Sequence, residues 1–262
     1  MKHRGDVYAT HGLGPVAQAL DIHRGDRMKT LVAMDTKSVA GKALVEERTG
    51  GCDNFRNGDH TTTLIRTENG KVIEIQHNVM TPQPYNRLYQ LTGTKGFANK
   101  YPVEGYALDA KQLTASGMEP KVDDLSSHSF LPKDEMNALV EKYQHPILKK
   151  YGEMAKEVGG HGGMDFIMDS RLVYCLQNGL PLDMDVYDLA EWCCLAELGE
   201  LSMDNGCASV AFPDFTRGEW NKIKGYKHAY ATPEEEAAIM EKAKAFTQKL
   251  KEKGAEEWAE DK

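Results

Sequence analysis

A β-hairpin in the first third of the chain constrains the fold more than any other feature. Residues 61–67 and 71–79 are rich in β-branched side chains and flank the turn sequence Glu-Asn-Gly at 68–70. Asn-Gly between two such runs is the strongest short-range signal for a hairpin. Ile73 and Ile75 share one face by period-two alternation, and polar residues occupy the other. The hairpin therefore predicts an antiparallel sheet with one packed face and one face open to water or a partner.

Further strand signals lie on both sides of the hairpin. Residues 30–34 are typical of a buried strand, and residues 35–58 carry mixed helix and loop signals. Residues 87–92 and 96–101, joined through a glycine-containing turn, indicate that the same sheet continues, and residues 106–108 extend it.

The pattern becomes helical from about residue 132. Residues 133–152 are amphipathic, and Pro146 is expected to kink or interrupt that helix. A second helix is predicted over 163–178 and ends at Gly179, and a third runs from about Asp185 to near Gly206. The apolar face of this third helix is expected to contain Val186, Leu189, Ala190, Cys193, Cys194, Leu198 and Leu201.

The order of these elements predicts the fold class. Strands come first and helices mostly later, which favours an α+β fold with a largely antiparallel sheet covered on one face by helices, and not a doubly wound sheet. No linker divides residues 1–262, so we expect a single domain, with a charged helical tail from about residue 233. No Gly-x-Gly-x-x-Gly follows a predicted strand, so the turn of a dinucleotide-binding domain is missing; the glycines at 159–163 follow a helix.

Composition and charge exclude several classes of function. The net charge is −8, from 32 basic and 40 acidic residues, with no block of Lys and Arg, so nucleic acid is not expected as a partner. No apolar run approaches the roughly 20 residues that cross a bilayer, and the first six residues lack the apolar stretch of a secretory signal. As it stands, the chain is expected to be soluble and untargeted, in the cytoplasm or exported as part of a longer precursor.

Cysteine and metal-ligand patterns are also uninformative for a cofactor. The five cysteines are expected to be buried small hydrophobic residues and not a disulfide framework. The sequence lacks the usual metal-ligand patterns, namely His-x-x-x-His, Cys-x-x-Cys and carboxylate clusters at metal-ligand spacing. No metal site is therefore predicted. Asp183, Asp185 and Asp188 are interpreted as complements to a helix dipole and not as the two carboxylates of an ordinary glycosidase.

The segment from Tyr8 to Pro15 is the strongest candidate for chemistry. Thr10 is a plausible N-cap for a short helix that starts near His11, so backbone amides would point toward a site. The positive end of the helix dipole favours a neutral His11 imidazole, which suits a base or a hydrogen-bonding role. The alternative is that His11 only caps or packs. Tyr8 lies three residues earlier and could place its phenol beside the imidazole, or could be a core tyrosine.

Three other features have a functional and a structural interpretation. Tyr85 follows two prolines that stiffen its approach, so its ring is expected to project from a loop. The glycine-rich segment 161–165 could approach a ligand closely, but small residues at a helix start also serve packing, which we favour. His77 shares a face with Ile73 and Ile75 and is expected to pack.

Residues 8–15 resemble the segment with which the C-terminal domain of glycoside hydrolase family 109 presents its sugar site. That family belongs to the Gfo/Idh/MocA oxidoreductase-like proteins. Further matches follow in the same order, at residues 62–65, 76–79, 84–87, 93–98, 161–165, 179–183 and 213–218. The resemblance covers roughly residues 5–220. It implies an open antiparallel sheet with helices on one face, and a Rossmann domain that precedes the matched region.

The resemblance also implies an activity and its residues. In the family, the 3-hydroxyl of the sugar is oxidised with tightly held NAD, a base removes the hydrogen on C2, the group on C1 leaves, water adds, and the ketone is reduced. It implies catalytic roles for His11, Tyr8 and Tyr85 and sugar contacts from Tyr8, Ala9, Thr10, His11 and Tyr85. Tyr8 would also contact NAD. Which of the three catalytic candidates removes the C2 proton stays open.

Substrate and partners follow from the same resemblance. The implied carbohydrate substrate is an α-N-acetylgalactosaminide, and a homo-oligomer through the sheet face is expected. Without a nucleotide-binding domain, which a separate or longer polypeptide would supply, the chain is expected to be inactive. A sugar dehydrogenase domain of the same superfamily and a non-catalytic sugar-binding or assembly module are the alternatives.

Overall fold

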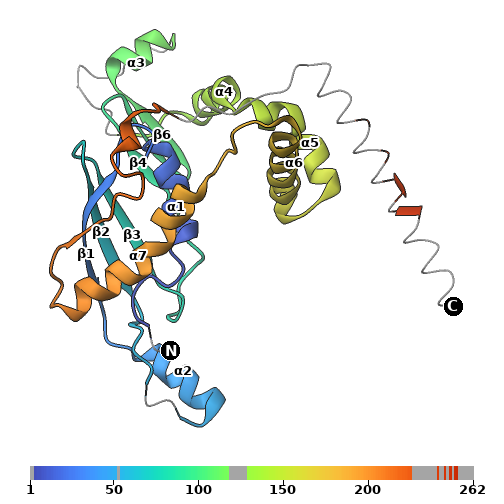
Figure 1. The fold of residues 1–262 in the computed structure, drawn as a ribbon. Helices are drawn as coiled ribbons and strands as arrows, with labels where there is room; N and C mark the ends of the chain where they lie inside the picture. The colour runs from blue at the N-terminus through green and yellow to red at the C-terminus, as the bar shows by residue number, and fades with distance from the viewer. Residues whose placement is uncertain are drawn as a thin grey trace.

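The fold is α+β, with two antiparallel sheets and helices mostly in the second half (Figure 1). The computed structural model describes residues 3–51, 54–117, 129–225, 241, 245, 248–249 and 251–252. The predicted fold class is confirmed. Of the tail predicted to be helical from residue 233, the few described residues are helical, and the rest lies outside the described residues.

The larger sheet contains the predicted hairpin and has the strand order β3-β2-β1-β7. Its strands are β1 (Met28–Asp35), β2 (Thr61–Thr67), β3 (Val72–His77) and β7 (Val210–Ala211). At the hairpin turn Gly70 adopts a φ of 83°, which glycine tolerates without a steric penalty. The strand predicted at 30–34 is confirmed as part of β1, although only one of its faces is buried.

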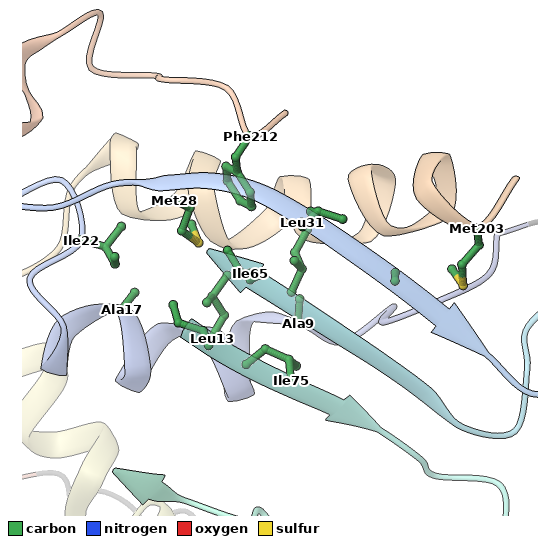
Figure 2. Close-up of a cluster of buried hydrophobic side chains, with 13 residues drawn as sticks. Ala9, Leu13, Ala17, Ile22, Met28, Leu31, Ile65, Ile75, Met203 and Phe212 are labelled. Atoms are coloured by element: carbon green, nitrogen blue, oxygen red, sulfur yellow. The ribbon is translucent and has the colours of Figure 1, made fainter. Parts of the chain in front are cut away.

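The core lies between this sheet and two helices, α1 (Thr10–Ala19) and α7 (Val186–Asp204). Leu31, Ile65 and Ile73 are cross-strand neighbours on the same face, and each is at most 3% exposed. Figure 2 shows Leu13 of α1 close to Ile65 and Ile75. Burial of these apolar side chains holds α1, and with it the candidate site at its first turn, against the sheet.

Glycine allows α1 to approach α7 closely. A Cβ at Gly14 would lie 3.3 Å from the ring of Trp192 on α7. The sequence Gly-Leu-Gly-Pro at 12–15 therefore serves helix packing as well as the start of the helix.

The buried face of α7 differs in part from the predicted one, of which Cys194 and Leu198 pack against the core. Val186 and Leu189 are 68% and 59% exposed, whereas Asp188 and Glu191 are 1% and 4% exposed. The observed buried face contains Asp188, Glu191, Leu195, Gly199, Ser202 and Met203. The apolar periodicity misled because two carboxylates are buried here with partners from another element.

The later strands form a separate sheet, which corrects the expectation of one continuous sheet. This three-stranded sheet has the order β4-β5-β6, with β4 at Gln90–Thr92, β5 at Gly96–Asn99 and β6 at Gly105–Leu108. The antiparallel pairing of β4 with β5 is confirmed. Tyr89, just before β4, continues the pairing through its carbonyl, which accepts from Lys100 N at 2.9 Å.

The predicted break at Pro146 is confirmed, because it separates α4 (Lys133–Tyr143) from α5 (Pro146–Val158). The following helix, α6 (Met164–Asn178), ends at Gly179 in the left-handed conformation, as predicted. In Figure 1, α5 and α6 lie side by side away from the larger sheet, so the expectation that these helices cover it was wrong. The remaining helical segments are α2 (Ala40–Thr49), α3 (Ala110–Ala115), η1 (His161–Gly163) and η2 (Glu219–Asn221).

Two further observations concern membranes and cysteines. Among the helices of the described residues, none combines the length and apolar character needed to cross a bilayer. The four described cysteines are free; Cys175 is buried as expected, but Cys193 is exposed. Cys52 lies outside the described residues.

Candidate functional site

Tyr8 and His11 form a stacked pair at the first turn of α1. Their ring centroids are 4.3 Å apart with an interplanar angle of 20°, and the Tyr8 hydroxyl lies 3.1 Å from His11 Nε2. Tyr8 is 58% exposed and His11 is also exposed. The predicted contact between phenol and imidazole is therefore confirmed, and the core interpretation of Tyr8 is wrong.

The residues between them, Ala9 and Thr10, have different environments. The structure makes Ala9 the N-cap of α1, without a side-chain cap, so Thr10 is the first helical residue and not the N-cap. Thr10 Oγ1 lies 3.4 Å from His11 Nδ1. The Ala9 side chain is in the core at 5% exposure, so it anchors the turn while Tyr8, Thr10 and His11 present polar groups outside it.

The hydrogen bonds of His11 suit proton transfer. When the imidazole proton is on Nδ1, facing Thr10, Nε2 carries a lone pair that accepts from the Tyr8 hydroxyl. A proton lost from the phenol then has an acceptor at 3.1 Å, and the reverse transfer uses the same contact. The pair can take up or release a proton at the surface of the domain.

Asp6 supports this turn from beneath. Asp6 is 3% exposed, and its Oδ1 accepts from the Tyr8 backbone amide at 3.2 Å. Burial raises the pKa of Asp6, and the nearby His77 opposes that shift. His77, expected only to pack, is half-buried and exerts an electrostatic effect on the residue that holds Tyr8.

Ion pairs fix the segment that leads into the turn. The Arg4 guanidinium binds both carboxylate oxygens of Asp35, at the end of β1, at 2.6 and 3.0 Å, and it also binds Asp204 at 3.0 Å. The Asp35 hydrogen bond raises the pKa of Arg4, although partial burial opposes this. Gly5 N donates to Asn57 Oδ1 at 2.8 Å. The candidate pair therefore lies on an anchored segment.

Tyr85 projects from the loop before β4, as predicted, and is 71% exposed. Its hydroxyl accepts from Arg87 Nε, and its ring meets Tyr101 edge-on, with centroids 6.1 Å apart. Hydrogen bonds to Tyr85 and then Tyr89 raise the pKa of Arg87. No contact joins Tyr85 directly to Tyr8 or His11 in the described structure. The link runs through Arg87 and Tyr89, whose hydroxyl donates to the His11 carbonyl at 2.5 Å.

The glycine-rich segment before α6 has a packing role. A Cβ at Gly163 would lie 2.6 Å from the Ala155 backbone, so only glycine permits this approach of α5 and α6. His161 is exposed, and its Nδ1 lies 2.9 Å from Asp165 Oδ2, which raises the pKa of His161. These contacts agree with the structural interpretation of residues 161–165.

A buried ionic cluster was not predicted. Arg24 binds Asp188 through two parallel hydrogen bonds of 3.0 and 2.9 Å, and His23 Nδ1 lies 2.9 Å from Glu191 Oε2. Asp185 caps α7 and also binds Arg24. The sequence-based interpretation placed Asp185 and Asp188 at a helix start, and the structure confirms that position, with Asp185 as the N-cap of α7 and Asp188 in its first turn. Their partners precede them by more than 160 residues, so no local pattern signals the cluster.

Metal-like spacing does occur within this cluster, contrary to the sequence-based expectation. Ligand atoms of His23, Asp185 and Asp188 lie within 4.8 Å of one another. The Arg24 guanidinium already neutralises charge on both aspartates. The cluster is therefore sufficiently explained as an ion-pair network, and the absence of a metal stays a prediction.

The described residues do not provide a dinucleotide-binding domain. Both of their sheets are antiparallel, whereas such a domain is built from parallel strands with helical crossovers.

Comparisons with known proteins bear on the family of this chain. Residues 1–222 match the model of "Glycosyl hydrolase 109, C-terminal domain". The chain is 87% identical over 262 residues to "Glycosyl hydrolase family 109 protein 5" of Phocaeicola vulgatus, covering 100% of this chain and 50% of that protein. It is 63% identical over 231 residues to "Glycosyl hydrolase family 109 protein" of Porphyromonas gingivalis, covering 88% of this chain and 49% of that protein. The chain thus spans about half the length of these relatives.

Among solved structures, the chain is similar to an NAD-binding protein from Listeria innocua. The TM-score is 0.27 and the identity is 15%, with 67% of this chain and 46% of that chain covered.

Proposed function

Because the chain belongs to glycosyl hydrolase family 109, as its C-terminal domain, we propose that it supplies the sugar-facing half of an NAD-dependent glycosidase that acts on α-N-acetylgalactosaminides. The observation that carries this proposal is the exposed pair of Tyr8 and His11, with 3.1 Å between the phenol oxygen and Nε2. A pair that transfers protons at the surface suits elimination at a sugar ring. It does not suit direct displacement, which needs two carboxylic acids.

Each residue of the site has a distinct role in this proposal. NAD, when bound by the other half, supplies reversible oxidation at the sugar's 3-hydroxyl, which acidifies the hydrogen on C2. Tyr8 and His11 act together to take up the C2 proton and to return a proton to C2 after water has added. Thr10 Oγ1 orients the imidazole from the Nδ1 side. Tyr85, exposed on the neighbouring loop, forms a wall against the sugar.

The cofactor would be held mainly outside the described residues. From this chain, Tyr8 would contact the nicotinamide, since its ring is exposed and lies at the start of α1. The chain alone is therefore expected to give no turnover of an aryl α-N-acetylgalactosaminide with added NAD. Turnover by the chain alone would contradict the proposal that NAD is bound mainly by another part of the protein.

The direct test joins this chain to the part of the 87% identical relative that it does not cover. The joined protein with NAD should release the aryl group, and His11→Ala should lower kcat by on the order of 10²- to 10⁴-fold, the usual contribution of a positioned acid or base. His3→Ala is the matched control, because His3 is exposed and pairs with Glu200 far along the sequence. Equal activity in both variants would refute the role of His11.

Two measurements separate the alternative functions: the turnover assay on the joined protein, and calorimetric sugar binding by the chain. Net accumulation of NADH without release of the aryl group would indicate a sugar dehydrogenase. Sugar binding by the chain without cofactor, unaffected by His11→Ala, would indicate a non-catalytic binding module.

We also propose that the chain forms a homo-oligomer through the face of the larger sheet opposite α1 and α7. Leu64 and Met34 on this face are 48% and 60% exposed, and Val72 is 67% exposed. Exposed apolar side chains gathered on an open sheet face are a common site of association.

A further inference from the structure

We propose that Tyr89 is a positioning residue that ties the Tyr85 loop to the helical turn carrying His11. Its hydroxyl donates to the His11 carbonyl at 2.5 Å, across 78 positions of sequence. The contact therefore sets where the sugar-contacting ring of Tyr85 lies relative to the proton-transferring pair. This inference rests on the function proposed above and assigns a role to a residue outside the expected site.

Pro15 explains why the His11 carbonyl can accept this bond. In an α-helix the carbonyl of residue 11 accepts from the amide of residue 15. Residue 15 is a proline inside α1, which has no N–H to donate. A helix carbonyl without its regular donor needs another partner, and the Tyr89 hydroxyl provides one. Pro15 and Tyr89 thus act together at the turn that presents His11.

Arg87 carries the connection from Tyr89 to Tyr85. Its guanidinium hydrogen-bonds the Tyr85 phenol and lies 5.6 Å from the centre of the Tyr85 ring. The Tyr89 phenol is near enough to contribute to the raised pKa of Arg87. Between Arg87 and Tyr89, Leu88 has a φ of 43°, a left-handed conformation that costs a leucine energy. Asn86 Oδ1 accepts from Leu88 N at 2.7 Å. Side-chain contacts therefore hold this loop in a conformation that the backbone does not favour by itself.

The two ends of the Tyr89 contact belong to different structural layers. The main chain of Tyr89 is fixed to the smaller sheet by its bond from Lys100 N. His11 belongs to α1, which packs on the larger sheet. The hydroxyl of Tyr89 therefore joins the layer that carries Tyr85 to the layer that carries Tyr8 and His11.

Tyr89→Phe removes only the hydroxyl and is the first test. In the 262-residue chain, amide hydrogen exchange at Leu88 should become about fivefold faster, the factor that one ordinary hydrogen bond contributes. The ¹³C resonance of the His11 carbonyl should also shift. Tyr85→Phe is the matched control, because it removes a phenol of the same loop and leaves the bond to His11 in place. Unchanged exchange at Leu88 and an unshifted His11 carbonyl in Tyr89→Phe would overturn the proposal.

A kinetic measurement on the joined protein separates positioning from general stability. Tyr89→Phe should raise KM for the aryl glycoside about fivefold and leave the pH profile of kcat unchanged. A fall in kcat with unchanged KM, equal in size to the loss of folded protein measured by circular dichroism, would mean that Tyr89 contributes only to the amount of folded protein, and would refute the positioning role. If the joined protein shows no glycosidase activity at all, the proposed function is refuted. The hydrogen-exchange and carbonyl measurements still test the contact between Tyr89 and His11 in that case.

Discussion

The imidazole of His23 lies 2.9 Å from Glu191, between Nδ1 and Oε2, and joins the loop after α1 to the middle of α7. Both side chains are almost completely buried. Burial works to lower the pKa of His23, but the hydrogen bond and charge of Glu191 outweigh it, so the net shift is upward. Burial also raises the pKa of Glu191, which His23 only partly offsets. The folded protein therefore binds protons more tightly here than the unfolded chain.

This relationship predicts how stability depends on pH. A raised pKa in the folded state means that the stabilisation is complete below the unfolded value, about 6.5 for histidine, and is lost as pH rises through the folded value. The free energy of unfolding should therefore fall as pH rises above about 6.5, by about 1.4 kcal/mol for each unit of pKa difference. Urea unfolding at a series of pH values measures it.

His23→Gln is the matched control for that measurement, since glutamine can still hydrogen-bond Glu191 but does not titrate. The decline above pH 6.5 should become shallower in this variant. Asp188 has its pKa lowered, because the Arg24 hydrogen bonds outweigh burial, and so affects stability only in acid. The same slope in His23→Gln and in the unmodified chain would show that His23 does not cause the decline.

The observed face of α7 predicts opposite results for two leucines. Leu195 is 1% exposed in the core, so Leu195→Ala should lower the free energy of unfolding by about 2–5 kcal/mol. Leu189 is 59% exposed, so Leu189→Ala should change it by no more than about 0.5 kcal/mol. Chemical denaturation compares them. Equal losses would support the apolar face predicted from the sequence instead.

Two neighbouring glycines test the packing role of residues 161–165. Gly162→Ala meets nothing within 4 Å and should cost only the left-handed backbone penalty, about 1–2 kcal/mol. Gly163→Ala places a Cβ 2.6 Å from the Ala155 backbone and should cost about 1–3 kcal/mol more. Thermal unfolding of both variants measures the difference. A larger loss in Gly162→Ala would contradict the packing of α5 against α6.

The open sheet face predicts an oligomer that a single charge disrupts. Leu64→Glu places a carboxylate in the middle of that face and should convert the assembly to a monomer in sedimentation equilibrium. Leu189→Glu is the control, because Leu189 is similarly exposed but lies on α7. A monomeric unmodified chain, or an assembly that persists in Leu64→Glu, would refute the proposed oligomer through this sheet face.

Local sequence signals predicted the local features well. The Asn-Gly hairpin, the break at Pro146 and the end of α6 at Gly179 all follow from backbone geometry that a few residues determine. The contact between Tyr8 and His11 belongs to the same class, because a spacing of three residues at a helix start brings two rings together.

The predictions that failed concern features that depend on residues distant in sequence. Asp188 and Glu191 appear polar and exposed until Arg24 and His23 are placed beside them. The pairing of β4 with β5 is encoded locally, but nothing in those residues specifies whether they join the larger sheet. The role of Tyr89 depends on the proline at 15, whose missing amide matters only once the loop meets the helix.

The most direct test of the proton-transferring pair uses the joined protein with NAD in deuterated water. If Tyr8 and His11 take up the C2 proton and return one from an exchanged site, the released sugar should carry deuterium at C2 by mass spectrometry and NMR. A released sugar with only protium at C2 would contradict the account, because a C2 proton taken up by this exposed pair should exchange with the deuterated solvent before a proton is returned.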